Sequence, residues 1–260
     1  MIYTLFHILY NFLWIAFALI SNAQEIVNIE DFYTFEKKLK NCETYGNVKF
    51  IINNNITITH QIEINYKDDV NIHITSLNKN VYINQNFLHH SVTNSLLQDN
   101  NRNLMISLSN IKEIKIDNIN INGNIGIYET DVFSIKSVNI IGDITLSKIK
   151  DEFLINNSHF KQNNEITHNG YIITIKESSE GTISDTIFDT DVSTKQVISI
   201  HDCNNLIIKD SKFNGSLDKI DKMENAHNFH RVFLIYNSNN IELNNLHIQN
   251  FGGNTFEGYI

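Results

Sequence analysis

The sequence predicts an all-β chain, a right-handed parallel β-helix (solenoid) with an N-terminal capping helix. Three observations support this prediction. One eight-residue pattern recurs five times, apolar and polar residues alternate with a period of two from residue 48 onward, and a single earlier segment has helical spacing instead. Stacked coils of short strands explain the first two observations, and a cap at one end explains the third.

Residues 1–23 have the features of a secretory signal peptide. An uninterrupted apolar run, "FLWIAFALI", covers residues 12–20, and the small residues Ser21 and Ala23 follow it, as cleavage requires. The segment before this run contains no Lys or Arg, so the alternative is an uncleaved membrane anchor. We therefore expect a secreted or extracellular-surface protein, with a membrane association only if this segment is uncleaved.

Residues 24–47 form the predicted cap region, which contains the sequence "NIEDFYTFEKKLKNC". Its apolar residues fall at spacings of three and four: Phe32, Phe35 and Leu39. Asn28 or Asp31 can cap the N-terminus of a helix, and lysines cluster at its C-terminal end. This pattern predicts a short amphipathic helix from about Asp31 to Leu39, which is either a lid on the solenoid or an ordinary surface helix.

Residues 48–260 form the predicted solenoid. The eight-residue pattern has apolar residues at its first, third and eighth positions and Asn or Asp at its fifth, with Gly replacing the first apolar residue once. Its copies begin at Ile114, Phe153, Gly181, Leu206 and Ile241. The last four are separated by 28, 25 and 35 residues, a spacing typical of one coil per repeat.

Within each coil, alternate side chains should point inward and stack on the next coil. The predicted core includes Ile114, Ile116, Ile155, Phe160, Ile183, Phe188, Leu206, Ile208, Phe213, Ile241 and Leu243. Ile207 and Lys209 should face outward. Because the pattern stops at residue 260 without a capping element, we expect the solenoid to be truncated at its C-terminal end.

The Asn or Asp at the fifth position is expected where the strand bends, since both residues tolerate left-handed backbone. The predicted ladder consists of Asn157, Asp185, Asp210 and Asn245. Leucine-rich repeats are the competing architecture. They place Asn three residues after the last strand leucine, whereas Asn157 and Asn245 come two residues after Ile155 and Leu243. This spacing favours the β-helix.

Two short motifs resemble those of a known family. The sequences "FKQNN" at Phe160 and "FGGN" at Phe251 supply F-x-x-N, and "NGYI" and "EGYI" follow them. In this respect the chain resembles the polymorphic outer membrane proteins, a family of secreted β-helical surface adhesins with alternating F-x-x-N and G-G-[Ala/Ile/Leu/Val] motifs. Both four-residue matches lack the first Gly and carry Tyr instead of a small residue. The resemblance implies a right-handed β-helix on a secreted, adhesin-like surface protein.

The charge balance argues against nucleic-acid binding. The formal net charge is −9, and only two arginines are present, whereas a nucleic-acid binder needs a basic stripe. The repeats predict an extended surface, and no acid, base and metal constellation matches a known site. We therefore favour a non-catalytic protein that binds glycans or a partner on a cell surface.

The alternative is a polysaccharide lyase or glycoside hydrolase, as in the pectate lyases and polygalacturonases that this chain resembles in predicted architecture (a pectin lyase-like fold). The candidate catalytic residues are Asp185, Asp189, Asp191 and Asp210. A lyase would use such carboxylates to hold calcium, and a hydrolase would need them to converge on a glycosidic bond. The other interpretation is that these aspartates form turns.

A second polar cluster lies in "MENAHNFHR", where Glu224, His227 and His230 are candidate zinc ligands. The spacing matches no recognised zinc motif, so a polar loop is the alternative.

The two cysteines, Cys42 and Cys203, should lie about six coils apart and remain free thiols, with Cys203 buried. Three sequons, at Asn55, Asn156 and Asn214, are compatible with a secretory route. No resident cofactor is predicted, apart from calcium in the lyase alternative.

Overall fold

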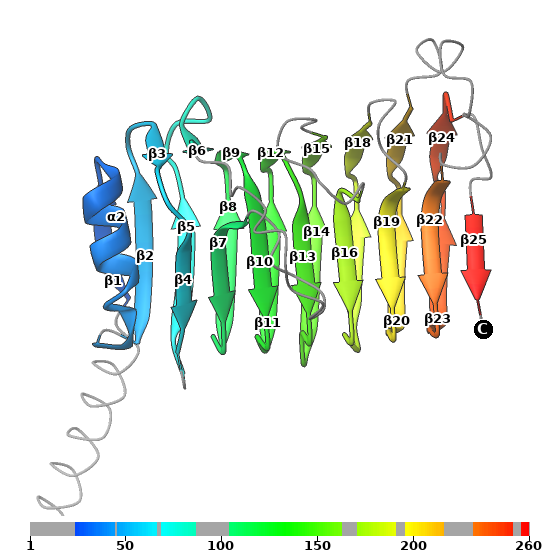
Figure 1. Ribbon diagram of the computed structural model, residues 1–260, viewed down its shortest axis with the longest axis horizontal. Coiled ribbons are helices and arrows are strands. Elements are labelled where there is room, and N and C mark those ends of the chain that lie inside the picture. Colours follow the sequence, from blue (N-terminus) through cyan, green and yellow to red (C-terminus); the bar gives the residue numbers. More distant parts are fainter. Residues whose placement is uncertain are drawn as a thin grey trace, which may run out of the picture.

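The computed structural model is a right-handed parallel β-helix built from three sheets, which confirms the predicted fold class (Figure 1). It describes residues 24–44, 46–66, 69–86, 104–162, 171–190, 196–215, 231–251 and 256–259. From β2 onward, each coil contributes one strand to sheet A, then one to sheet B, then one to sheet C, whereas β1 belongs to sheet A alone. All strand pairs are parallel.

The strands of sheet A, in order along the stack, are β1 (Glu25–Ile29), β2 (Asn47–Ile52), β5 (Asn71–Thr75), β8 (Glu113–Asp117), β11 (Val132–Lys136), β14 (Glu152–Asn156), β17 (Gly181–Ser184), β20 (Asn204–Lys209) and β23 (Asn239–Asn244). Sheet B consists of β3 (Ile56–Ile58), β6 (Tyr82–Gln85), β9 (Asn120–Asn122), β12 (Asn139–Ile141), β15 (His159–Lys161), β18 (Ile187–Asp189), β21 (Lys212–Asn214) and β24 (His247–Gln249). Sheet C consists of β4 (Ile62–Asn65), β7 (Leu104–Ser109), β10 (Asn124–Tyr128), β13 (Ile144–Ser147), β16 (Ile173–Lys176), β19 (Gln196–His201), β22 (Arg231–Tyr236) and β25 (Phe256–Tyr259).

The register of sheet A confirms the repeat alignment. Phe153 pairs with Gly181, Gly181 with Leu206, and Leu206 with Ile241. One coil was missed: Phe133 lies between Ile114 and Phe153 in the same row. Its repeat has Ser137 at the fifth position, where the other copies have Asn or Asp, so the pattern did not include it.

The core runs along the axis of the solenoid. Of the predicted core residues, only Ile241 and Leu243 are half-buried, because they belong to the last strand of sheet A; the others are buried. Phe160, Phe188 and Phe213 stack, with ring centroids 5.2 and 4.8 Å apart and nearly parallel planes. Such stacking contributes beyond the apolar area that it buries.

The same register corrects the F-x-x-N comparison. Phe213 pairs with Ile248, so the row that contains Phe160 continues through Ile248. Phe251 lies three residues further along the chain. The two F-x-x-N motifs therefore begin at different places in their coils, and they do not mark equivalent positions of one repeat.

Left-handed residues form the corners between sheets A and B, as predicted for the fifth position. Asn157, Asp185, Asp210 and Asn245 have φ between 49° and 52°. Asn245 donates from Nδ2 to Asp210 Oδ1 at 2.7 Å, whereas Asn157 donates to Ser137 Oγ at 3.0 Å. The predicted amide ladder thus exists in segments. Asn and Asp suit this backbone because their short polar side chains lower its steric cost.

The connections from sheet B to sheet C carry most of the variation in coil length. The connections from A to B contain two residues in all coils from β8 onward. From B to C, a single residue separates β9 from β10, whereas residues 86–103 separate β6 from β7 and residues 215–230 separate β21 from β22. Insertions on one edge of a solenoid are typical of a surface that varies with function.

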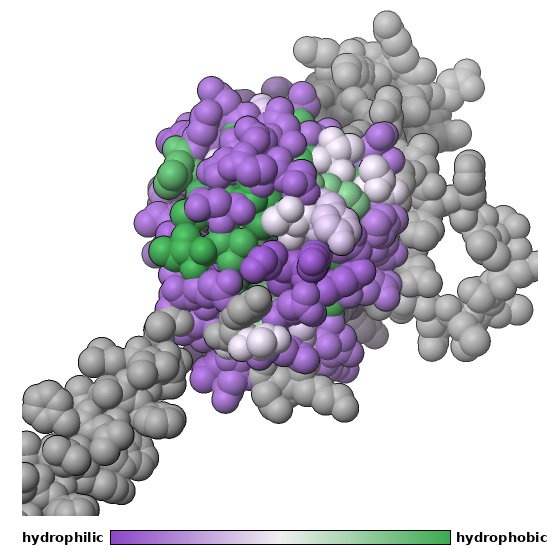
Figure 2. Space-filling model, turned by 90° about the vertical axis from the view of Figure 1, so that its left-hand side faces the viewer, coloured by the Kyte–Doolittle hydropathy of each residue, from purple (hydrophilic) through white to green (hydrophobic). Residues whose placement is uncertain are grey.

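The cap consists of β1, helix α2 (Phe32–Leu39) and the 3-10 turn η1 (Cys42–Thr44). Asp31 is the N-cap, and its Oδ1 accepts from the Thr34 backbone N–H at 2.8 Å. Phe35 and Leu39 are fully buried, and the Phe35 ring contacts Phe50 of β2 edge-on at 5.7 Å. The helix lies at one end of the stack (Figure 1), and the surface of that end is largely hydrophilic with one hydrophobic patch (Figure 2). The predicted lid is confirmed.

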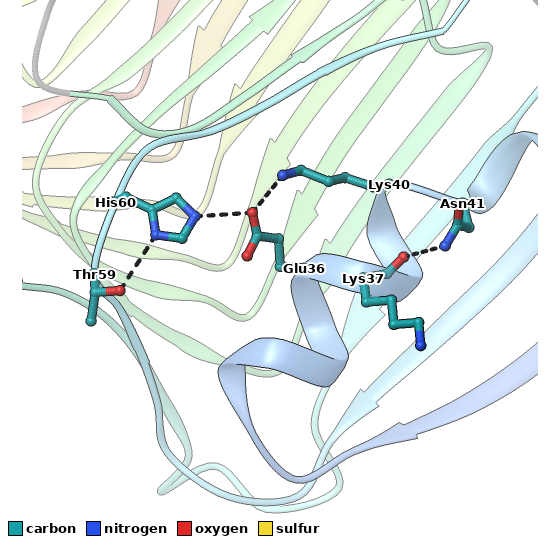
Figure 3. A network of polar contacts seen from close by, with 6 residues as sticks. All are labelled: Glu36, Lys37, Lys40, Asn41, Thr59 and His60. Atoms are coloured by element: carbon teal, nitrogen blue, oxygen red, sulfur yellow. Dashed lines mark hydrogen bonds and ion pairs between the residues drawn. The ribbon is translucent and has the colours of Figure 1, made fainter.

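A polar network ties the exposed side of α2 to the solenoid (Figure 3). Glu36 Oε1 accepts from Lys40 Nζ at 2.6 Å and lies 2.9 Å from His60 Nε2. The hydrogen bond from Lys40, followed by that from His60, lowers the pKa of the Glu36 carboxyl. His60 precedes β4, and its ring meets the Phe32 ring edge-on at 5.1 Å. The network therefore holds the helix in its docked position.

Both cysteines are buried free thiols, which confirms that prediction. Cys42 lies in η1 next to the first coil, and Cys203 immediately precedes β20. The strands β5, β8, β11, β14 and β17 lie between β2 and β20 in sheet A. This separation excludes a disulfide within one chain.

None of the helices in the described part of the chain has the length and apolar character needed to cross a membrane. The predicted signal peptide, residues 1–23, lies outside the described residues.

Candidate functional site

The candidate site is a polar ladder on the outer face of sheet B. It consists of His159, Asp189, Asn214, His247 and Gln249, which come from β15, β18, β21 and β24. Each of these strands contributes one or two outward side chains, while its middle residue, such as Phe188 or Phe213, points into the core. The one-in, one-out alternation of a strand thus places the polar side chains on the solvent side.

Asp189 is the centre of the ladder. Its Oδ2 lies 2.6 Å from His159 Nε2 in the preceding coil, and its Oδ1 accepts from Asn214 Nδ2 at 2.8 Å in the following coil. About two fifths of the side chains of His159 and Asp189 remain exposed. The carboxylate is therefore held from both sides, and it keeps lone pairs that can accept hydrogen bonds from a ligand.

The ladder continues toward the C-terminal end. Gln249 Nε2 donates to Asn214 Oδ1 at 2.9 Å, and His247 Nε2 lies 3.1 Å from Gln249 Oε1. His247 and Gln249 are exposed. Because each amide uses only part of its hydrogen-bonding capacity within the ladder, it retains a donor or an acceptor for another molecule.

The ladder borders the edge where coil length varies. Asp189, Asn214 and Gln249 are the last residues of their strands, and each leads into a connection between sheets B and C. Their spacing is set by the distance between neighbouring strands, about 4.8 Å. The arrangement is thus a row of hydrogen-bonding groups repeated along the solenoid axis.

The outer faces of the other two sheets differ from this one. On sheet C, the outward row Thr145, Thr174 and Ser199 is buried. On sheet A, His73 Nε2 lies 2.6 Å from Asp117 Oδ2, and Thr75 Oγ1 donates to the other oxygen of the same carboxylate. Among the described residues, this second cluster joins only two neighbouring coils of the sheet, those of β5 and β8.

The structure separates the aspartates that the sequence grouped together. Asp185 and Asp210 lie in neighbouring coils at the corner between sheets A and B, whereas Asp189 lies at the far end of β18. Asp185 accepts from Asn156 Nδ2 at 3.1 Å, and Asp210 accepts from Asn245 at 2.7 Å. Asp185 thus bonds to an amide in the preceding coil and Asp210 to an amide in the following coil.

The remaining candidates, Asp191, Glu224, His227 and His230, lie outside the described residues. Their connections join β18 to β19 and β21 to β22, so both leave sheet B in neighbouring coils. Within the described ranges, no three His, Cys, Asp or Glu side chains are grouped to hold a metal ion.

The sequence patterns did not identify His159, Asn214, His247 and Gln249 as site residues. A signal for them was present. In the repeats that begin at 153, 181, 206 and 241, the seventh and ninth positions are outward in sheet B, and the ninth is Lys161, Asp189, Asn214 or Gln249. Aligning the repeats beyond their eighth residue would have shown this polar column.

Comparisons with known proteins add no relative: no family model, curated protein or solved structure matches this chain.

Proposed function

We propose that this protein is a secreted or cell-surface β-helix that binds glycans along the sheet B ladder. The observation that carries the proposal is the continuous hydrogen-bonded row from His159 to Gln249 on an accessible sheet face. A linear polymer that lies along the solenoid axis would meet a similar set of polar groups at each coil.

The chemistry of the ladder suits sugar hydroxyls. A hydroxyl both donates and accepts, and the amides of Asn214 and Gln249 and the carboxylate of Asp189 together offer donors and acceptors. A nucleic acid is a poor match, because the chain has a formal net charge of −9. The ladder carries one carboxylate and no arginine, which favours a neutral or weakly charged glycan.

The secreted, adhesin-like character is part of the same proposal. It is supported by the apolar run at residues 12–20 and the small residues after it, and by the F-x-x-N motifs that resemble those of the polymorphic outer membrane proteins. The two F-x-x-N motifs occupy different positions in their coils, so they support the proposal less than the signal-like N-terminus does.

Affinity electrophoresis in gels that contain plant or microbial polysaccharides tests the binding. We expect at least one polysaccharide to retard the protein. Gln249→Ala should weaken that retardation by about two- to tenfold in affinity, since one hydrogen bond contributes a net 0.5–1.5 kcal/mol, roughly. The matched control is Asn244→Ala, an exposed residue of the same coil on sheet A, which should leave binding unchanged. Equal retardation of both variants, or none for the parent protein, would rule out this ladder as the site.

A second candidate function is a polysaccharide lyase or glycoside hydrolase. The observation that favours it is the His159–Asp189 pair, in which a carboxylate holds an imidazole, the side chain that enzymes use most often for general acid–base catalysis. Asp185 and Asp210 would be further carboxylates, with calcium as the cofactor of a lyase.

This candidate is tested by product formation. The protein is incubated with the same polysaccharides, with and without calcium, and new reducing or unsaturated ends are measured. Product that disappears in Asp189→Asn, or in the double variant Asp185→Asn and Asp210→Asn, would establish an enzyme. Binding without product would favour the non-catalytic protein.

A further inference from the structure

We infer that the folded protein carries one N-linked glycan, on Asn55, although the chain has three sequons. The inference rests on the proposed secretion, because this modification occurs on the secretory route. Asn55 lies in the turn between β2 and β3, whereas Asn156 and Asn214 are the last residues of strands inside their sheets. An N-glycosylation acceptor belongs on a surface loop.

The turn at Asn55 presents its amide nitrogen to solvent. Asn55 is exposed, and its Oδ1 accepts from the Tyr82 backbone N–H at 3.0 Å. No described residue accepts a hydrogen bond from its Nδ2. The two preceding residues, Asn53 and Asn54, both donate to Glu30, which fixes the turn. A glycan on Nδ2 leaves Oδ1 in place, so the bond to Tyr82 is kept.

Asn156 has its amide nitrogen engaged in the sheet. Its Nδ2 donates to Ser184 Oγ at 2.9 Å and to Asp185 Oδ2 at 3.1 Å. These two bonds use both N–H groups of the amide. Attachment of a sugar would remove one of them, and it would place the sugar against Ser184 and Asp185 of the next coil.

Asn214 is held in the sheet B ladder. Its Nδ2 donates to Asp189 and its Oδ1 accepts from Gln249. The next residue, Gly215, lies so close to Asn250 that an added Cβ would approach its carbonyl oxygen to 2.1 Å. The backbone of this sequon is therefore packed against the next coil. The Asn214 side chain forms hydrogen bonds to both the preceding and the following coil.

The modification is a group transfer to the Asn55 amide. Nδ2 forms a C–N bond to the anomeric carbon of an oligosaccharide carried on a lipid diphosphate. The anomeric C–O bond breaks, the lipid diphosphate leaves with the electron pair, and one amide proton is released to the transferring enzyme.

The test uses the full chain expressed in eukaryotic cells and recovered from the medium. Peptide N-glycosidase removes the glycan and leaves aspartate, which peptide mass spectrometry locates. We expect one glycan, on Asn55. It should be lost completely in Asn55→Gln and also in Thr57→Ala, which removes the sequon while leaving Asn55 and its bond to Tyr82 intact; Thr57 is an exposed residue of β3. Asn156→Gln and Asn214→Gln should each retain the glycan.

A glycan on Asn156 or Asn214 of the secreted protein would overturn the inference. So would an unmodified Asn55 in protein found in the medium, and in that case secretion itself would stand. If the chain stayed in the cell with Met1 intact and no glycan, both the inference and the proposed secretion would fail.

Discussion

The corner residues connect the sequence of each repeat to its shape. Asn or Asp occupies the left-handed position in most coils, but Glu129, Lys148 and Glu177 occupy the corresponding corner between sheets C and A, with φ of 52°, 57° and 49°. Long side chains are less favourable in this conformation than Asn. At these three corners the stability of the solenoid is therefore not at its maximum.

Lys148→Asn should raise the unfolding free energy by up to about 1 kcal/mol, because Asn tolerates left-handed backbone better than Lys. The exposed ion pair with Glu129 at 3.3 Å is lost, but such pairs contribute little. Thermal melting measures the effect. Lys150→Asn is the matched control, since Lys150 has a similar exposed ion pair, with Asp131, but no left-handed backbone. A lower melting temperature for Lys148→Asn than for Lys150→Asn would contradict the argument.

Ile208 and Lys209 are neighbours on β20 that face opposite sides. Ile208 is 1% exposed, and Lys209 is exposed. Ile208→Asp should destabilise the protein by several kcal/mol, roughly, because it buries an unpaired charge. Lys209→Asp should change stability by less than about 0.5 kcal/mol. Urea unfolding of both variants checks the prediction, and equal midpoints would mean that the inward and outward faces are assigned wrongly.

At the scale of elements, the cap contains a pH-sensitive contact. Hydrogen bonds from Lys40 and His60 lower the pKa of Glu36 below its ordinary value of 4.5. A carboxylate whose pKa is lower in the folded state stabilises the fold above its unfolded pKa, and this stabilisation disappears as the pH falls through the lower, folded value.

We therefore expect the melting temperature to fall as the pH decreases from about 5 toward 3, and Glu36→Gln to remove part of that decrease. Glu63→Gln is the control, because Glu63 lies on the exposed face of β4 and is bonded only to Gln61 among the described residues. If the pH profile of Glu36→Gln matched that of the parent protein, the network in Figure 3 would not anchor the helix.

The elements could largely be predicted from the sequence, because each follows from a local pattern. The helix followed from the spacing of Phe35 and Leu39, and the strands followed from alternation. The coil at Phe133 was missed because Ser137 adopts the left-handed backbone without being Asn or Asp. The Phe251 motif was misplaced because only the inter-strand register shows that Ile248 follows Phe213.

The site was less predictable, because it depends on contacts between coils. His159 and Asp189 are thirty residues apart in the chain, and they meet because β15 and β18 are paired in adjacent coils. A pattern within one repeat cannot show that meeting. Asp189 is a candidate in the sequence because Asp185 and Asp191 lie close to it in the chain. In the structure, its hydrogen-bonding partners are instead His159 and Asn214.

At the scale of the whole molecule, the positions of the two cysteines test the coil arrangement. Burial raises the pKa of the Cys42 thiol to about 12 and that of Cys203 to about 11. At pH 8 both should react slowly with iodoacetamide in the native protein, since the thiolate is scarce and shielded. The denatured, unreduced protein should give two thiol equivalents. Rapid native alkylation, or fewer than two equivalents after denaturation, would contradict the arrangement.

The length dependence of glycan binding tests the central claim most directly. The probe is a size series of linear oligosaccharides prepared from the polysaccharide that retards the protein most, and the measurement is the dissociation constant by calorimetry. A ladder that extends over four coils predicts that affinity rises with each added sugar over several units, and that Gln249→Ala weakens binding of the longer members while Asn244→Ala does not. Affinity that reaches its maximum with a mono- or disaccharide, or equal binding by the two variants, would contradict a site that extends along sheet B.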